Sequence, residues 1–326
     1  MRNDPATWQR LALILSVSAI TLYNPLVLFA QSTQPVPRIG LLGLSVEDHL
    51  KQSLLAGLRE SGYSKVTIVD RGDLHDYAEL LPAALDLVQQ RVAVILAFGS
   101  RAPRDAFQAT KTIPIVIIGG DPVAMGLARS HSRPGGNVTA VSARNLDLSG
   151  KQLELLREFV PKLKRLAVVL NPDSPDELTS LSTIKAQAQR VNVDVHPIEI
   201  RRPDDFEPAF DTAAKADSEA LWIIPSTSFI AHRKRIAALA LKYRMPSITR
   251  RSEYVESGTL VAYGPNLALL FRRAGNYAAR ILKGQSPAEL PIDQAAEFEL
   301  VVNETTAKAL GLKIPETVRY RATIVQ

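Results

Sequence analysis

The chain repeats one order of strands and helices twice, and this repeat restricts its fold more than any other feature. Two apolar strands of the first copy, at Ile39 and Ile95, are 56 positions apart. The corresponding strands of the second copy, at Ala167 and Ile223, are also 56 positions apart. Short apolar strands that alternate with helices form βαβ units with a parallel sheet. The sequence therefore predicts two doubly wound (Rossmann-like) α/β lobes with parallel sheets, joined by a hinge.

The end of one predicted strand combines glycine with an acidic residue. The apolar run Ile113–Ile118 stops at Gly119-Gly120, and Asp121 precedes an apolar-periodic segment at 123–128. The two glycines let backbone approach a ligand closely. Asp121 has two interpretations: it caps the next helix and forms a turn, or it pairs with an amine of a ligand.

The C-terminal portion is expected to return first to one lobe and then to the other. The helix near 267–282 is assigned to the first lobe, and the strand near 298–303 to the second. Hinge motion would be absorbed at Ser142-Ala143, Ile248-Thr249 and Ile292-Asp293. The predicted boundaries are residues 38–142 and 250–292 for lobe 1, and residues 143–249 and 293–326 for lobe 2.

The N-terminal residues have the pattern of a secretory signal peptide. Arg2 and Arg10 precede the apolar run Leu11–Ile20, and small residues lead to Ala30. This order of basic, apolar and cleavable segments predicts a signal peptide at 1–30, cleaved after Ala30, and a linker at 31–37. The chain has no cysteine, which excludes a lipoprotein anchor, a thiol nucleophile and cysteine-ligated zinc.

Composition and motifs point away from catalysis and from nucleic acid. The formal charge is +6, with Lys and Arg spread along the chain and no nucleic-acid reader motif. The five histidines lack metal-ligand spacing, and neither a G-x-S-x-G elbow nor a Walker A loop nor a G-x-G-x-x-G fingerprint occurs. The sequence thus predicts no catalytic residue, no metal, no cofactor and no nucleic-acid partner.

The predicted ligand site lies at the carboxyl ends of the strands, where ligands bind in open α/β sheets. The residues at these ends are mostly small and polar, and they offer hydrogen bonds without reactive chemistry. Free N–H groups at helix starts there favour a carboxylate, although such residues are equally often only helix caps. Two tyrosines of the returning segment either contact a ligand or pack in the core. The candidate ligand-binding residues are Leu44, Ser45, Gly99, Ser100, Gly120, Asp121, Ser142, Asn171, Ser226, Thr227, Tyr254 and Tyr263.

Several motifs resemble those of one family, the periplasmic ABC-transporter substrate-binding proteins related to tryptophan and tyrosine binders. The shared motifs are IPIV at 113–116, DPV at 121–123, RPGGNVT at 133–139, YVE-x-G at 254–258, RILKG at 280–284 and FELVVN at 298–303. The resemblance covers nearly the whole chain after the leader, while Arg101, Pro103, Arg250 and Arg251 depart from it. It implies the type I periplasmic-binding-protein architecture.

The resemblance implies a periplasmic receptor and not an enzyme. Such a receptor closes its lobes on a small polar ligand, for example an aromatic amino acid or a related carboxylate, and delivers it to an ABC permease in the inner membrane. We expect it to act as a monomer. Two alternatives remain at this stage: a secreted lyase or isomerase on the same scaffold, with Asp121 or Glu253 as general base, and a sensor that presents ligand to a membrane kinase.

Overall fold

The computed structural model describes residues 36–326 except residues 75, 144–147 and 296. The predicted signal peptide at 1–30 and all but the end of the predicted linker lie outside the described residues. Among the described residues, no helix combines the length and the apolar character needed to cross a membrane.

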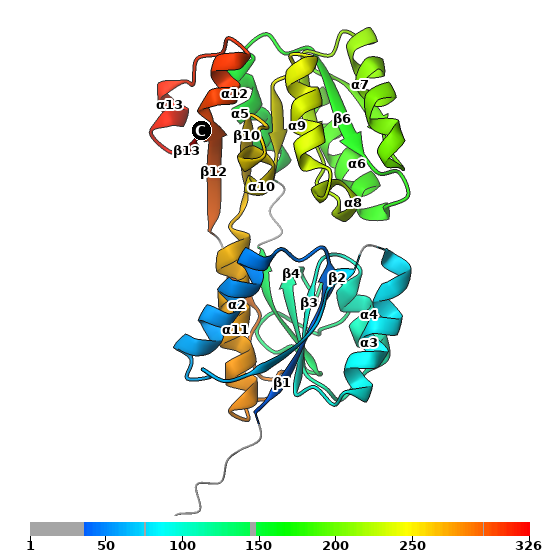
Figure 1. Cartoon of the computed structure of the whole chain (residues 1–326), viewed down its shortest axis with the longest axis vertical. Coiled ribbons are helices and arrows are strands. Elements are labelled where there is room, and N and C mark those ends of the chain that lie inside the picture. The colour runs from blue at the N-terminus through cyan, green and yellow to red at the C-terminus, as the bar shows by residue number, and fades with distance from the viewer. Residues whose placement is uncertain (1–35, 75, 144–147, 296) are drawn as a thin grey trace, which may run out of the picture. The chain divides into compact units, whose positions relative to one another are not determined.

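Six parallel strands form the first sheet, in the order β2-β1-β3-β4-β5-β11 (Figure 1). Helices α2 and α11 share one apolar core with this sheet, and α3 and α4 share the other. The strand bounds are β1 (Arg38–Leu44), β2 (Thr67–Leu74), β3 (Val94–Phe98), β4 (Ile115–Gly119), β5 (Val138–Ala143) and β11 (Asp293–Ala295). The helix bounds are α2 (Asp48–Glu60), α3 (Leu80–Gln89), α4 (Ala102–Ala109) and α11 (Leu267–Leu282).

Seven strands form the second sheet, in the order β7-β6-β8-β9-β10-β12-β13. Helices α5 and α6 pack in one of its cores, and α7 and α9 in the other. The strand bounds are β6 (Arg165–Leu170), β7 (Asp194–Glu199), β8 (Ala220–Ile223), β9 (Ser247–Thr249), β10 (Val261–Pro265), β12 (Phe298–Asn303) and β13 (Thr323–Val325). The helix bounds are α5 (Ser149–Phe159), α6 (Pro175–Gln189), α7 (Phe206–Lys215), α8 (Thr227–Ile230), α9 (Arg233–Lys242), α10 (Ser252–Glu256), α12 (Glu304–Ala309) and α13 (Glu316–Arg319).

The two sheets share one topology, as the sequence repeat predicts. In each, the first strand of the copy lies between the second and third, and the fourth and fifth follow outward. Alternation along β3 explains why this central strand is apolar at every position: Val94 and Leu96 enter one core, while Ile95 and Ala97 enter the other. Strands buried on both faces need apolar side chains at every position. Two strands depart from the predicted parallel pattern, since β12 pairs with β10 antiparallel and β13 runs parallel to β12.

The sheet membership of two segments differs from the predicted lobe boundaries. Residues 250–266 were assigned to lobe 1, but β10 pairs with β9 and β12 in the seven-stranded sheet. Residues 293–295 were assigned to lobe 2, but β11 pairs with β5 in the six-stranded sheet. The second passage between the sheets therefore falls between β10 and α11, and the third after β11, rather than at Ile248-Thr249 and Ile292-Asp293. Periodicity reveals a strand but not its pairing partner, which explains both errors.

Helices α2 and α11 cross at two glycines. A Cβ added to Gly57 would lie 1.8 Å from the carbonyl oxygen of Arg272, and one added to Gly275 would lie 2.3 Å from that of Leu54. Only glycine permits two helix backbones to approach this closely. The returning helix α11 is therefore held firmly on the first sheet, as the sequence predicts for 267–282.

Candidate functional site

The strand order defines where a ligand site is expected in each sheet. In the first sheet, β2 and β3 lie on opposite sides of β1, so the carboxyl ends of β1 and β3 flank a switch point. In the second sheet, β6 and β8 occupy the same positions. Ligands of open α/β sheets bind outside the carboxyl ends of the strands at such switch points. The relevant residues are therefore those that follow β1, β3, β6 and β8.

The carboxyl ends of the first sheet place most of the predicted residues together. Ser45 follows β1 with φ of 47°, and its N–H donates to the Leu74 carbonyl at 3.0 Å. Gly99 and Ser100 follow β3 and are both exposed. Two other predicted residues are buried beneath these strand ends: Leu44 is 6% exposed and Ser142 is 2% exposed. The neighbouring strands thus present backbone and the hydroxyls of Ser45 and Ser100 rather than a row of polar side chains.

Asp121 is engaged within its own loop. Its Oδ1 accepts hydrogen bonds from the N–H groups of Val123 at 2.9 Å and Ala124 at 3.3 Å, and Nε2 of His131 lies 3.1 Å from its Oδ2. The segment 123–128, expected to be helical, forms turns instead, because it is short and Gly126 adopts a positive φ of 73°. Asp121 therefore forms a turn next to Gly120, as one interpretation predicts, but it caps no helix, because the described residues that directly follow it form turns.

The carboxyl ends of the second sheet contain a buried acid that the sequence analysis missed. Glu177, in the first turn of α6, is 5% exposed, and its Oε2 accepts a hydrogen bond from the Asn171 N–H at 2.7 Å. Burial raises the pKa of Glu177 from 4.5 to about 7, against hydrogen bonds from Asn171, Ser226 and Ser174 and the charge of Arg250, which lower it. The signal was present in the sequence, since Ser174-x-x-Glu177 has capping-box spacing.

The remaining predicted residues of the second sheet fall into two groups. Asn171 is half-buried, and its Oδ1 accepts a hydrogen bond from the Asp173 N–H. Ser226 is buried, and Thr227 begins α8 after the short loop that follows β8. Tyr263 is half-buried near the end of β10, with its ring 6.0 Å from that of Phe298. Tyr254 is fully buried among apolar residues, which favours its core interpretation.

One group of ionisable residues has the spacing of a cation site. Potential ligand atoms of Glu47, His49 and Glu253 all lie within 4.8 Å of one another. Both carboxylates, however, are paired with guanidinium groups, those of Arg233 and Arg251. Two arginines among the carboxylates disfavour a further cation, so the group is better described as an ion-pair network.

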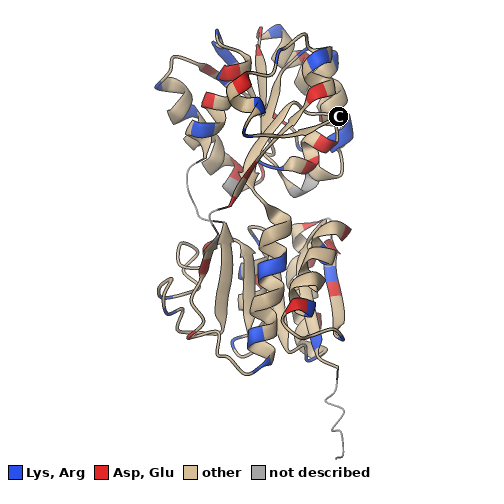
Figure 2. Cartoon of the chain, turned by 90° about the vertical axis from the view of Figure 1, so that its left-hand side faces the viewer, with Lys and Arg blue, Asp and Glu red and all other residues tan. Residues whose placement is uncertain are grey.

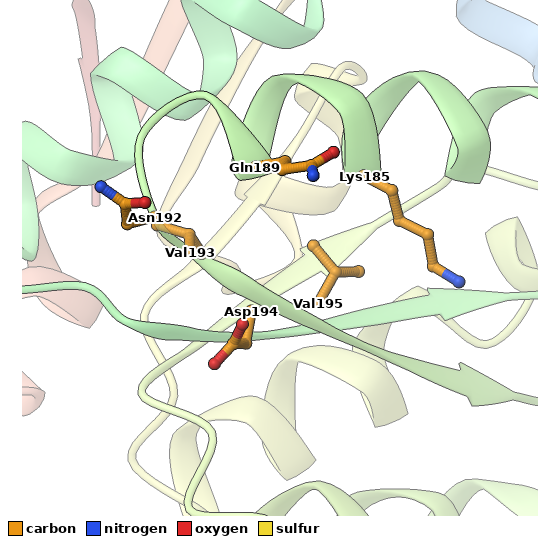
Figure 3. Close-up of a pocket in the computed structure, with 6 residues that line it drawn as sticks. All are labelled: Lys185, Gln189, Asn192, Val193, Asp194 and Val195. Atoms are coloured by element: carbon orange, nitrogen blue, oxygen red, sulfur yellow. The ribbon is translucent and has the colours of Figure 1, made fainter.

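A surface hollow lies away from these strand ends. It is lined by Lys185, Gln189 and residues 192–195, at the end of α6 and the amino end of β7 (Figure 3). Ligand sites of this topology form at carboxyl ends instead. The hollow is therefore not part of the candidate site.

The two doubly wound lobes with polar strand ends define the type I periplasmic-binding-protein fold.

Comparison with known proteins identifies the family. The sequence profile described as ABC transporter substrate binding protein matches residues 45–326. A curated relative, the tyrosine-binding protein of Clostridioides difficile (strain R20291), is 26% identical over 271 residues, which cover 82% of this chain and 77% of the relative. The chain belongs to the ABC transporter substrate binding protein family, as its motifs indicate, and is a substrate-binding protein.

Solved structures share the fold over most of the chain. A conserved domain protein from Vibrio cholerae is 25% identical with a TM-score of 0.80, over 89% of this chain and 100% of that chain. An ABC domain in complex with L-Trp from Streptococcus pneumonia is 22% identical with a TM-score of 0.78, over 89% of this chain and 100% of that chain. These likenesses confirm the predicted fold class.

Proposed function

We propose that the protein is a periplasmic receptor that binds an aromatic amino acid or a related small carboxylate and delivers it to an ABC permease of the inner membrane. The observation that carries this proposal is the pair of switch points, one in each sheet, lined with hydrogen-bonding groups and exposed backbone. Such groups bind a small polar ligand reversibly. The tyrosine-binding relative supports the choice of ligand class.

The proposed contacts divide by exposure. Residues at the surface of the strand ends would touch the ligand, whereas buried ones would hold those ends in place. The proposed ligand contacts are Ser45, Gly99, Ser100, Gly120 and Asp121 from the first sheet, and Asn171 and Tyr263 from the second. Thr227 is proposed as a contact from its position at the start of α8 alone. The proposed supporting residues are Leu44, Ser142, Ser226, Glu177 and Tyr254.

An amino acid suits this distribution of groups. Its carboxylate is favoured by backbone N–H groups and by the start of α4, next to the exposed Ser100. The ammonium group of the amino acid would be attracted by the carboxylate of Asp121. Basic and acidic residues are intermixed over the chain in Figure 2, a pattern that suits a small ligand better than a polyanion.

The proposal includes the cellular setting. The N-terminal sequence supports export by a cleaved signal peptide, and the chain, lacking cysteine, would be released without a lipid anchor. The receptor would act as a monomer that meets its permease only transiently. We propose no enzymatic activity, because among the described residues of the candidate site no nucleophile pairs with a general base.

A ligand screen tests the proposal. Residues 31–326 are purified and their melting temperature is measured with each aromatic amino acid, other amino acids and small acids. A ligand that binds only the folded state raises the melting temperature by mass action, by an amount that grows with its concentration. Titration calorimetry of the best ligand should give a one-to-one complex, which Ser100→Ala weakens without loss of stability. Turnover of a compound, or no shift with any of them, would contradict the proposal.

A further inference from the structure

Glu47 forms ion pairs with two arginines of the other lobe. It follows the end of β1 and precedes α2, so it belongs to the lobe of the six-stranded sheet. Its Oε1 lies 2.9 Å from Nη2 of Arg233, and its Oε2 lies 3.4 Å from Nη2 of Arg251. Arg233 begins α9 and Arg251 follows β9, so both belong to the lobe of the seven-stranded sheet. The side chain of Glu47 therefore links the two lobes, and Nε2 of the neighbouring His49 lies 4.0 Å from Oε1 of Glu253 in the other lobe.

Arg233 is held in position by its own lobe. Its Nε donates to Oγ of Ser257 at 3.1 Å, and its Nη1 donates to the carbonyl of Ile230 at 2.8 Å. These bonds leave Nη2 directed at Glu47. Because the guanidinium is already fixed, the arrival of the carboxylate costs little additional side-chain entropy.

Arg251 is fixed in the same way by Glu253. Its Nη2 lies 2.6 Å from Oε1 of Glu253 and its Nε lies 3.2 Å from Oε2, a bidentate pair. The side chains of Arg251 and Glu253 are only 13% and 6% exposed. Burial alone would raise the pKa of Glu253, but the Arg251 guanidinium holds it below its usual value. The pair remains ionised and presents a fixed positive edge to Glu47.

The positive and negative charges of this network are equal in number only while the lobes are in contact. Two carboxylates, Glu47 and Glu253, face two guanidinium groups, Arg233 and Arg251. Removal of Glu47 leaves the second lobe with one uncompensated positive charge in a partly buried position. Charge-assisted bonds of this kind are stronger than those between exposed groups. The contact thus favours the joined arrangement of the lobes over a separated one.

We propose that Glu47 is a latch residue that stabilises the joined arrangement and thereby raises ligand affinity without touching the ligand. The effect on affinity rests on the proposed function, since a ligand held by both lobes binds only the joined arrangement. The apparent dissociation constant is then the intrinsic one divided by the fraction of protein in that arrangement. Glu47 is accordingly a positioning residue.

The test measures the distance between the lobes in the ligand-free protein. Because the chain has no cysteine, spin labels can be placed by Leu85→Cys in α3 and Leu241→Cys in α9, at positions 45% and 40% exposed. Glu47→Gln should shift the distance distribution away from that of the parent, and Arg233→Gln should do the same. Glu47 contacts both Arg233 and Arg251, so Arg233→Gln should have the smaller effect, and the double variant should add little to Glu47→Gln alone.

The matched control is Glu60→Gln, at the other end of the helix that Glu47 precedes. Glu60 also pairs with an arginine, Arg272, but that residue lies on α11 of the same lobe. This variant should leave the distance distribution unchanged. For a ligand found in the screen, Glu47→Gln should weaken binding about three- to tenfold, while Glu60→Gln should not.

The two proposals fail in different ways. If Glu47→Gln leaves the distance distribution of the ligand-free protein like that of the parent, the latch is refuted, whatever ligand is found. If the distribution shifts as expected but no compound binds, the latch stands and the proposed function fails.

Discussion

The buried carboxyl of Glu177 makes a specific prediction about stability and pH. This residue lies at the carboxyl end of the second sheet, where its Oε2 accepts the Asn171 N–H. Burial raises its pKa from 4.5 to about 7. The substitution Glu177→Gln retains a side-chain oxygen that can accept the same bond, but removes the titrating group.

The sign and size of the effect follow from linkage. Between about pH 4.5 and pH 7 the unfolded chain has lost this proton and the folded protein keeps it, so the free energy of unfolding falls as the pH rises. The stabilisation from Glu177 is fully present below about pH 4.5 and is lost as the pH passes about 7. Since each pKa unit corresponds to about 1.4 kcal/mol, the full loss is about 3 kcal/mol.

Urea unfolding of both proteins from pH 4.5 to 8 measures this difference. Over this range the free energy of unfolding of the parent should fall by about 3 kcal/mol more than that of Glu177→Gln. The variant therefore becomes more stable relative to the parent at neutral pH. Glu154→Gln, at a glutamate of α5 whose side chain is 68% exposed, serves as control and should follow the parent. The reasoning is refuted if the difference in free energy of unfolding between the parent and Glu177→Gln does not change with pH. It is also refuted if the parent becomes more stable relative to the variant as the pH rises.

Three further substitutions test other parts of the structure. Gly275→Ala places a Cβ 2.3 Å from the Leu54 carbonyl oxygen and should lower the free energy of unfolding by about 3 kcal/mol, whereas Gly136→Ala, with open space around it, should not; equal denaturant midpoints would contradict this. Asp121→Ala removes the acceptor of two N–H groups and should cost about 1 kcal/mol, while Asp121→Asn, which keeps an acceptor, should cost less than about half of that in the same assay. Tyr254→Phe deletes a buried hydroxyl that has no hydrogen-bond partner among the described residues, so it should leave the melting temperature equal or higher, and a marked decrease would reveal a partner.

Most of the fold is predictable from the sequence because it depends on local patterns. The spacing of Ile39 and Ile95, repeated at Ala167 and Ile223, corresponds to strands that occupy the same places in the two sheets. Apolar runs buried on both faces are distinctive, and helix periodicity located α11 correctly. Strand pairing is different. The apolar side chains of the segment that forms β10 could be buried in either sheet, so only tertiary contacts decide which sheet it joins.

The site is less predictable because its polar contacts span loops. Glu177 has the spacing of a capping residue, but it also bonds Ser226, which comes from the end of another strand, β8. The contact of Asp121 with His131 likewise joins two ends of a loop without regular structure. No periodicity encodes such contacts. The sequence identified the strand ends correctly as polar, but not which polar groups are occupied by the protein itself.

A crystal structure with the best ligand from the screen tests the central claim most directly. The account predicts one ligand molecule in contact with residues after β1 or β3 of the first sheet and after β6 or β8 of the second, among them Ser100 and Asn171. Its carboxylate should accept hydrogen bonds from backbone N–H groups. A ligand bound to one sheet alone, or in the hollow beside Lys185 and Asp194, would contradict the account.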